Sequence, residues 1–492
     1  MGWFAWLRIG CLVACMAIAV VVLTRAIRLT WPALIASFAA RPARSAAPAR
    51  LGALGIALIG ILIYLGIARP GWLQFGLLGA TIGAIDVLAV ATIRRHPGGR
   101  GTMIWVLAVS LVGMLASLAL WSPGQADANR YIMEGRQILA GQNPYAIPPE
   151  AAEARALVPA EVAGEVNHPS WTAIYPPIAL LYHAAVAAIA PEPFLFCLSA
   201  IAGMILLFAL TLHLLKEMRL EPAHLVAIAW HPVLFIFIIG GAHQDMLMAV
   251  LLVGALAAAA SGKISGSVLG GAAAILVKPF AVVCLPLLLH RIPKRYWILP
   301  PAVVLAVYVP WIDAGDGVVR SLLRFGEGHY HAVIAPVIRY AVRPLSAGGA
   351  EPTLVTLILC GVLILGLYVA WRRSRSDLIA RRAMRLLAVL MLCLPVLHPW
   401  YLFTLVALLP FSRGWGLLAW TAASPLAMLH GLGIRDGVWN EQWWVTMISH
   451  APTLPLVLHE IFAQLPMHGV RSPEPSTACD VTPYGPHASK AG

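Results

Sequence analysis

The stretch "FLFCLSAIAGMILLFALTLHL", residues 194–214, decides the fold. It contains no Asp, Glu, Lys or Arg, and it has the length of about 20 residues that carries an α-helix across a bilayer. Similar apolar runs recur along the whole chain, at residues 9–24, 51–68, 72–93, 102–121, 177–190, 224–240, 246–260, 264–289, 297–312, 352–371, 386–410, 414–432 and 445–463. The sequence therefore predicts an all-α polytopic membrane protein, a bundle of about 11 to 14 transmembrane helices.

The composition agrees with a membrane protein and excludes several other classes. Of the 492 residues, 60% are hydrophobic and 11% are charged, and the mean hydropathy is +0.82, which leaves too little polar surface for a soluble domain. The net charge of +13 comes mostly from arginines between the apolar runs. This pattern indicates the loops of a membrane protein and not a nucleic-acid-binding surface. The seven cysteines show neither metal-ligand spacing nor a disulfide framework.

Basic loops set the expected orientation in the membrane. Arginines are concentrated in three loops, which should be cytoplasmic: residues 25–50, 94–100 and 372–385. The single run 102–121 separates the second of these from residues 122–176, so this long loop is expected on the extracytoplasmic side. It holds six of the 21 acidic residues and is net acidic in a basic protein.

The apolar runs and loops divide the chain into six expected segments. The run 177–190 is expected to cross only part of the membrane, because a full crossing would place Lys216 and Arg219 outside. The run 9–24 is interpreted as an uncleaved anchor, since no clear small-residue cleavage site follows it. The segments are N-terminal transmembrane helices (1–121), an extracytoplasmic catalytic loop (122–176), a transmembrane core (177–312), a second extracytoplasmic loop (313–350), C-terminal transmembrane helices (351–465) and a disordered tail (466–492).

The first loop opens with a short amphipathic helix predicted over residues 127–140. Asp127, Arg130, Tyr131 and Glu134 lie at helical spacing on one face. The opposite, apolar face is expected to lie on the outer membrane surface, and Gly141 is placed to end the helix. Asp127 is interpreted either as the helix N-cap or as a general base tuned by an adjacent arginine, and the two roles are compatible.

Ionisable residues at membrane depth are functional candidates, because burying them is costly. His243 and Asp245 are two positions apart, so on a regular helix they would not share a face. Lys278 lies within a long apolar run and either extends its ammonium to the interface or binds a phosphate. His398 precedes Pro399 inside another run, where the proline must kink the helix and a hydrogen-bonded histidine is the simplest explanation.

Five motifs occur in a fixed order that resembles a known family. They are "DANRYIMEGRQILAGQNPY" (127–145), "NHPSWTAIYPP" (167–177), "GGAHQDMLMAVLL" (240–252), "AAAILVKPFAVVCLPLLL" (272–289) and "LHPWYLFTLVALLP" (397–410). The set resembles the GT-C superfamily of polyprenyl-phosphate-sugar-dependent glycosyltransferases, above all the bacterial mannosyltransferase-like proteins of the family 87 type. Met133 stands where this family commonly has an aromatic residue.

The resemblance implies a reaction and a set of site residues. Members transfer a sugar with inversion, and Asp127 would deprotonate the acceptor hydroxyl, with Glu134 the next candidate for the base. Arg130, Lys278 and the arginines of residues 313–343 would hold the departing lipid phosphate. His329 and His331 are weaker candidates from a loosely similar segment. The remaining residues carried over as substrate or lipid-phosphate ligands are Tyr131, Asn143, Tyr145, His168, Tyr175, His243, Asp245, His398 and Tyr401.

The implied partners are a polyprenyl-phosphate-linked sugar, with mannose favoured among hexoses, a glycolipid or glycan acceptor, and membrane lipids, with no nucleic acid. The implied location is the bacterial cytoplasmic (inner) membrane, with the active site facing outward. No metal site is assigned, although a divalent metal stays open because some GT-C enzymes need one. The main alternative function is a secondary transporter or lipid-carrier flippase, but the two corresponding halves typical of transporters are not visible. A non-enzymatic homologue is the third, and the retained Asp, Arg and Tyr set argues against it.

Overall fold

The computed structural model describes residues 47–96, 99–120, 125–290, 292–326, 330–345, 351–375, 377–435 and 440–463. The predicted anchor at 9–24, most of the basic loop 25–50, His329 and the predicted tail 466–492 lie outside these residues. The described part is helical, and Tyr330 and Val396 form an isolated β-bridge outside the helices. The predicted all-α class is confirmed.

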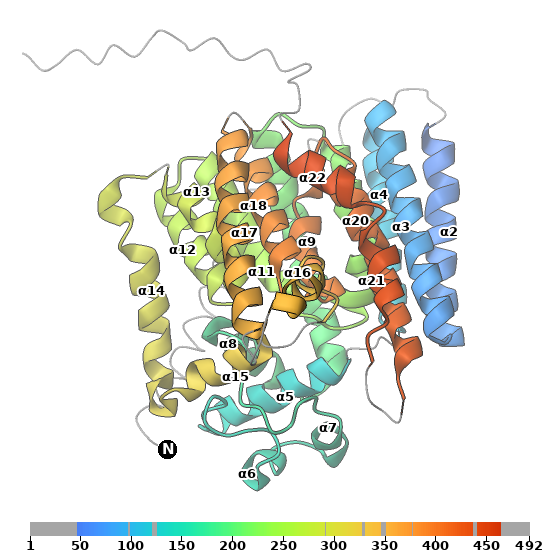
Figure 1. Cartoon of the computed structure of the whole chain (residues 1–492). Coiled ribbons are helices and arrows are strands. Elements are labelled where there is room, and N and C mark those ends of the chain that lie inside the picture. The colour runs from blue at the N-terminus through green and yellow to red at the C-terminus, as the bar shows by residue number, and fades with distance from the viewer. Residues whose placement is uncertain are drawn as a thin grey trace, which may run out of the picture.

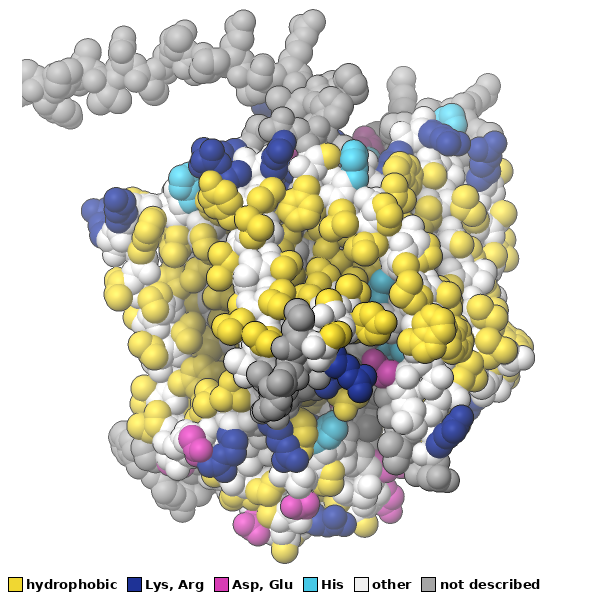
Figure 2. Space-filling view, in the orientation of Figure 1, with side chains coloured by type: hydrophobic (Ala, Val, Ile, Leu, Met, Phe, Trp, Pro, Cys, Tyr) yellow, Lys and Arg dark blue, Asp and Glu magenta, His cyan; other side chains and the backbone are white. Residues whose placement is uncertain are grey.

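Long apolar helices form the body of the protein. In the part of the chain that the structure describes, five helical stretches are long and apolar enough to cross a membrane: Pro48–Ala68, Trp72–Arg95, Pro193–Glu217, Lys294–Ala314 and Thr353–Arg373. Figure 2 shows a broad hydrophobic band between one rim of Lys and Arg side chains and a second region of mixed charge. Large apolar residues such as Ile67 and Leu305 are exposed, as lipid-facing residues would be. The chain is a polytopic membrane protein.

The helices are arranged in one bundle, with α2, α3 and α4 along one side and α14 at the other (Figure 1). The long members are α2 (Ala47–Ala68), α3 (Trp72–Arg95), α4 (Arg100–Ser117), α9 (Pro193–Glu217), α11 (Asp245–Ala260), α14 (Leu299–Tyr308, extended by η5, Val309–Ala314, and preceded by η4, Lys294–Tyr296), α17 (Glu351–Arg373) and α18 (Ile379–Cys393). Close helix contacts depend on small residues. Gly83, for example, lies where a Cβ would be 2.1 Å from the carbonyl oxygen of Ala422.

Several apolar runs predicted as single spans are broken helices. The breaks fall at or next to prolines, which cannot donate a backbone hydrogen bond and clash with the preceding turn. The run 224–240 forms η1 (Pro222–Leu225), α10 (Val226–Ala229) and the π-helical η2 (Leu234–Ile239), and the run 264–289 forms α12 (Ile264–Ile275), η3 (Pro279–Cys284) and α13 (Leu285–Leu289). In the run 386–410, α18 is followed by η7 (Pro399–Leu402), α19 (Phe403–Val406) and η8 (Leu409–Phe411). The last two runs form α20 (Gly416–Ala423) with η9 (Ser424–Gly433), and α21 (Trp443–His450) with α22 (Leu454–Phe462). The expectation of single regular spans was therefore wrong for these runs, apart from the predicted interruption at Pro399.

The run 177–190 forms a short helix, as the charge pattern suggested. Helix α8 (Pro177–Ala187) has 11 residues, which at 1.5 Å per residue reach about 16 Å, roughly half of the hydrocarbon core. Its first residue is a proline, a position where the missing N–H is not needed. Helix α8 packs on α5 (Gln125–Leu139) of the first loop.

Short helices of the two loops form a layer at one end of the bundle (Figure 1). This layer contains α5, α6 (Ala152–Arg155), α7 (Ala160–Gly164) and α15 (Gly317–Gly326), while α16 (Ala335–Val342) and η6 (Arg343–Leu345) follow in the second loop. The apolar face of α5 does not lie on a membrane surface. Met133 is fully buried in a small core with Ala154, Ala163 and Val166, so α6 and α7 cover the face that was predicted to contact lipid.

Candidate active site

Helix α5 carries the first motif, and two glycines set where it ends and how closely it packs on the bundle. At its end Gly141 has a φ of +80°, and the N–H groups of Gly141 and Gln142 donate to the carbonyls of Ile138 and Gln137, the pairing of a Schellman motif. In its middle, Gly135 lies where a Cβ would be 2.5 Å from the carbonyl oxygen of His183 in α8. The absence of a side chain at Gly135 lets α5 and α8 approach closely.

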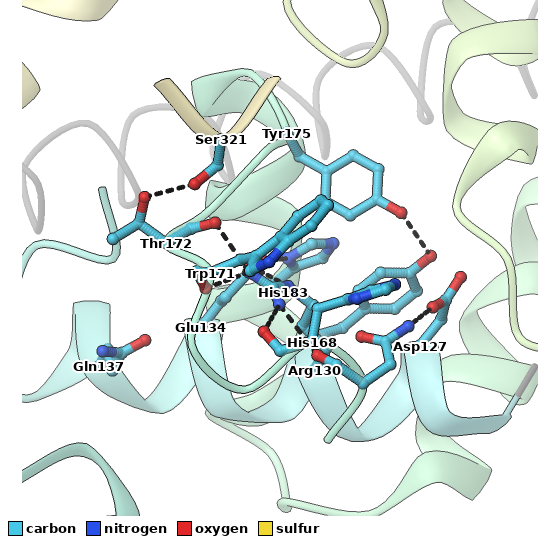
Figure 3. Close-up of polar contacts among 12 residues, drawn as sticks. Asp127, Arg130, Glu134, Gln137, His168, Trp171, Thr172, Tyr175, His183 and Ser321 are labelled. Carbon is cyan, nitrogen blue, oxygen red and sulfur yellow. Dashed lines mark hydrogen bonds and ion pairs between the residues drawn. The ribbon is translucent and has the colours of Figure 1, made fainter. Parts of the chain in front are cut away.

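Asp127 lies in the first turn of α5 and is not its N-cap, because the helix begins at Gln125. Its carboxylate Oδ1 accepts a hydrogen bond from the side-chain amide of Asn167 (Figure 3). Its Oδ2 lies 3.5 Å from Nδ1 of His243, and its side chain is 15% exposed. Burial raises the pKa of Asp127 to about 6, and the Asn167 hydrogen bond and the nearby Lys278 oppose a larger rise. A pKa near the working pH suits a general base.

Arg130 fixes the loop that holds Asn167. Its Nε donates to Glu134, its Nη1 donates to the carbonyls of Asn167 and His168, and its Nη2 donates to the carbonyls of Trp171 and Thr172. A guanidinium has five N–H groups, and these five bonds use all of them (Figure 3). The geometry therefore joins α5 to residues 167–172, and it leaves no N–H group of Arg130 directed at a ligand.

Glu134 is held on both of its oxygens. Oε1 accepts from Arg130 at 2.9 Å, and Oε2 lies 3.2 Å from Nδ1 of His183 in α8. Burial alone would raise the pKa of Glu134, but Arg130 and His183 outweigh it and hold the pKa below its ordinary value. Nε2 of His183 in turn lies 2.7 Å from Oε1 of Gln244. Glu134 is 1% exposed and acts as the centre of a buried polar network.

The tripeptide from His243 to Asp245 directs three consecutive side chains to three different partners. It follows Ala242, whose φ is +55°, and it precedes the first full turn of α11. His243 faces Asp127, and Gln244 contacts His183. Asp245 accepts a hydrogen bond of 2.5 Å from Nζ of Lys278. His243 and Asp245 do not share a face, as their spacing predicted, and the turn explains how both still reach the site.

The ammonium group of Lys278 forms an ion pair with Asp245. Its Nζ lies 3.9 Å from the centroid of the Tyr401 ring as well as near Asp245, an arrangement that combines an ion pair with a cation–π contact. Lys278 is 4% exposed. The ammonium therefore does not extend to the interface, and an ammonium has three N–H donors, one of which Asp245 accepts.

Aromatic rings connect the second half of the chain to Asp127. The ring of His243 stacks on Trp400 at 3.9 Å, and Trp400 stacks on His398 at 4.5 Å, with interplanar angles of 10° and 7°. His398 makes edge contacts with Tyr401 at 5.3 Å and with His331 at 5.5 Å. The kink at Pro399 thus places His398 in a ring stack, where no hydrogen bond of its side chain is found among the described residues.

Asn143 and Tyr145 join the two loops. The amide of Asn143 donates to Asp313 at 2.6 Å, and the Tyr145 hydroxyl donates to the carbonyl of Tyr175 at 2.5 Å. The ring of Tyr145 packs edge-on against Trp311 at 5.5 Å. Both residues are buried, so the "NPY" part of the first motif holds residues 309–317 against the first loop.

Tyr131 of α5 and Tyr175, which precedes α8, are in contact with each other. Their hydroxyl oxygens are 3.4 Å apart, and Tyr131 stacks on His183 at 4.3 Å. His168 has a φ of +45° and stacks on Trp171 at 4.6 Å. Burial lowers the pKa of His168, and Arg130 and Arg324 add to the effect, so this half-exposed ring is neutral at pH 7.

The structure also identifies polar residues that sequence reasoning missed. Asn167, His183, Gln244 and Trp400 each contact a predicted site residue. Asn167, Gln244 and Trp400 lie inside three of the five motifs and could have been found there. His183 is an ionisable residue inside the apolar run 177–190, and this position is the signal that could have found it. A separate group of His331, His430 and Glu441 brings ligand atoms together, and of these three residues only His331 was a candidate from the sequence.

These features define a class of protein. The helical membrane bundle holds a largely buried carboxylate at the start of a loop helix, and the pKa of this carboxylate is raised to about 6. This is the arrangement that the resemblance to GT-C glycosyltransferases implies. The comparisons with known proteins agree with this class and support a GT-C mannosyltransferase-like protein.

The particular relatives are mannosyltransferases. Residues 72–292 match the family described as alpha-(1->6)-mannopyranosyltransferase, N-terminal domain. Over 379 residues the chain is 25% identical to Alpha-(1->6)-mannopyranosyltransferase A of Mycobacterium tuberculosis, which covers 67% of this chain and 71% of that protein. No solved structure matches the chain. The family match contains Asp127, Arg130, His243 and Lys278 but ends before His398.

Proposed function

We propose that the protein transfers a hexose, with mannose favoured, from a polyprenyl-phosphate donor to a hydroxyl group of a glycolipid or glycan acceptor. The reaction takes place on the extracytoplasmic side of a bacterial cytoplasmic membrane, where the α5–α7 layer would lie under the positive-inside rule. The name of the relative in Mycobacterium tuberculosis supports mannose. The buried carboxylate of Asp127, with its pKa raised to about 6, is the observation that carries the proposal.

In this proposal Asp127 is the general base. The acceptor hydroxyl oxygen attacks the anomeric carbon and forms the new glycosidic bond, while its proton passes to Asp127. The bond between the anomeric carbon and the phosphate oxygen breaks, and its electron pair leaves with the lipid phosphate. Attack from the side opposite the leaving group inverts the anomeric centre. One carboxylate with no second carboxylate acting as nucleophile suits this single displacement.

Buried polar atoms without partners support a polar ligand beside Asp127. Among the described residues, neither ring nitrogen of His243 and not Oδ2 of Asp245 has a hydrogen-bond partner. Buried polar groups are rarely left unsatisfied, so sugar hydroxyls are suited to bond there. Lys278 has donors left for the lipid phosphate, which becomes more negative as the bond breaks.

Arg130 and Glu134 have different roles in this proposal from those that the family resemblance implies. The bonds of Arg130 to four backbone carbonyls assign it to the position of residues 167–172, and through them to the Asn167 amide on Asp127. Glu134 orients Arg130 and His183. Both are positioning residues, and the phosphate is left to Lys278 and to the exposed Arg324 beside Trp171.

The test is mannosyl transfer in membranes that contain the full chain, with labelled polyprenyl-phosphate mannose as donor and a total lipid extract as acceptor. Asp127→Asn should abolish label transfer, a loss of about 100-fold or more for a general base. Glu150→Gln, a matched change at an exposed carboxylate of the same loop, should transfer label like the wild type. Transfer by Asp127→Asn at the wild-type rate would place the base elsewhere. If wild type transfers no mannose, other lipid-linked sugars are tested, and failure with all of them favours a transporter.

A further inference from the structure

A second cluster of ligand-type side chains lies apart from Asp127. One ligand atom from each of His331, His430 and Glu441 lies within 4.8 Å of the others. The three residues come from separate segments, since His331 precedes α16, His430 lies in η9 and Glu441 precedes α21. We propose that these three residues bind a divalent transition-metal ion, with zinc the best fit. The proposal stands independently of the reaction at Asp127.

The donor set has the chemistry of a zinc site. Two imidazoles and one carboxylate are ligands that zinc takes in proteins, whereas calcium and magnesium prefer oxygen alone. His331 is 3% and His430 1% exposed, while the Glu441 side chain is 27% exposed. The two rings are therefore buried, and the carboxylate is the ligand of the three that solvent reaches most. Nδ1 of His331 already lies 3.7 Å from Oε1 of Glu441.

The backbone of His331 is held in an unusual conformation that the cluster explains. Its φ is +53°, a region that residues with side chains adopt at an energetic cost, most often at functional sites. Its N–H donates to Oε1 of Glu441 at 2.6 Å, and its carbonyl lies 3.2 Å from Nε2 of His450. Trp420 donates to Nδ1 of His450, which fixes the His450 proton on Nε2. Such outer hydrogen bonds orient metal ligands in known sites.

Metal binding at Nδ1 of His430 would replace a hydrogen bond that this nitrogen accepts. The backbone N–H of Gln442 donates to Nδ1 of His430 at 2.9 Å. Ligation of a metal by this nitrogen replaces that bond, and a set of metal–ligand bonds contributes far more than one neutral hydrogen bond. Gln442 follows Glu441 directly, so a small shift of one peptide segment both releases Nδ1 of His430 and advances the carboxylate.

The ion would bind at the His331 end of the series of ring contacts that begins at His243, and it would not contact Asp127. The ring of His331 lies 5.5 Å from His398, and His398 stacks on Trp400, which stacks on His243. Four rings therefore separate the ion from the carboxylate. Its role is to hold the segments of His331, η9 and Glu441 together on one side of the stack.

The experiment measures metal binding directly. Tag-free full-length protein in detergent is stripped with a chelator and dialysed against dilute zinc, and the bound metal is counted by mass spectrometry. Cobalt(II) replaces zinc in a parallel sample, where its visible absorption reports nitrogen and oxygen ligands. Wild type should bind about one ion per chain, and zinc should raise its thermal unfolding temperature.

The variants identify the ligands. His430→Ala and the isosteric Glu441→Gln should each weaken zinc binding about tenfold or more and remove the cobalt absorption. His459→Ala, a histidine exposed on α22, is the matched control and should bind like the wild type. The Glu441→Gln amide oxygen can still accept from the His331 N–H, so this variant keeps the fold if His430→Ala does not. A wild type that binds no zinc, or a Glu441→Gln variant that binds it unchanged, overturns the proposal.

Discussion

Nδ1 of His243 lies 3.5 Å from Oδ2 of Asp127, without the geometry of a hydrogen bond. The two side chains come from a membrane-embedded turn and from a loop helix, more than a hundred positions apart in the sequence. Because His243 is stacked flat on Trp400, its ring cannot rotate toward Asp127 without breaking the stack. A hydroxyl group that bonds to both atoms would have to lie beside the line that joins them, since hydrogen bonds are about 2.8 Å long. This relationship leads to the first prediction.

The pH dependence of transfer should report Asp127. A base with a pKa of about 6 is active when ionised, so kcat/KM should rise with pH and level off above about pH 7. The Asn167 hydrogen bond stabilises the ionised form, and Asn167→Ala should therefore raise the pKa and move the rising limb to higher pH. Initial rates of mannosyl transfer over a series of buffers measure the shift.

Asn129→Ala is the control for this measurement. Asn129 lies on the same helix, but its amide donates to Glu165, so the change should leave the midpoint of the limb in place. A rising limb that stays at the wild-type pH in Asn167→Ala would show that another group titrates.

The same raised pKa predicts how stability changes with pH. Asp127 binds its proton more tightly in the folded chain, where its pKa is about 6, than in the unfolded chain, where the ordinary value is 3.8. The stability that this proton gives is present below about pH 4 and is lost as pH rises to about 6, a difference of about 3 kcal/mol. Asp127→Asn should match wild type near pH 4 and unfold at a higher temperature near pH 7. Unfolding curves in detergent that differ equally at both pH values would contradict this.

The sequence predicted the parts of the fold that depend on local patterns. Helix α5, its end at Gly141 and the short α8 with Pro177 at its start follow from helical periodicity and from glycine and proline preferences. The breaks inside the apolar runs were harder to predict, because neighbouring helices in a bundle satisfy the freed backbone groups. The partners of Arg130 were also hidden, since four backbone carbonyls converge on it only when residues 167–172 fold back.

Arg130 provides a prediction that separates a positioning role from phosphate binding. Lysine keeps the positive charge but cannot make five directed bonds, so Arg130→Lys should lose as much activity as Arg130→Ala, about 100-fold. Amide hydrogen exchange of residues 167–172 should become faster in both variants. Arg155→Lys, at an exposed arginine of the same loop, should change neither measurement. Near-normal activity in Arg130→Lys, with only the donor KM raised, would show that Arg130 binds the lipid phosphate.

The Lys278–Asp245 pair predicts strong coupling between two substitutions. Lys278→Met leaves the carboxylate of Asp245 buried without its ammonium partner, and this should destabilise the fold by about 3–5 kcal/mol. Lys278→Met combined with Asp245→Asn removes both charges and should recover most of that stability. Unfolding free energies of the two single variants and the double variant form the cycle that measures the coupling.

The activity of this double variant distinguishes structure from function. If Lys278 binds the donor phosphate, the double variant should show a higher KM for the donor than Asp245→Asn alone. A KM equal to that of Asp245→Asn would limit Lys278 to a structural role.

Gly135→Ala and Gly164→Ala should change the stability of the protein in opposite directions. In Gly135→Ala the new Cβ would lie 2.5 Å from the carbonyl oxygen of His183, and the neighbouring atoms are backbone. Helix α5 must then move away from α8, at a cost of about 1–3 kcal/mol, and it carries Asp127 away from His243. Gly164→Ala meets nothing within 4 Å and should stabilise α7 by up to about 1 kcal/mol. Unfolding temperatures and transfer rates of both variants check this, and equal activity in the two would mean that the α5–α8 distance does not set the position of the base.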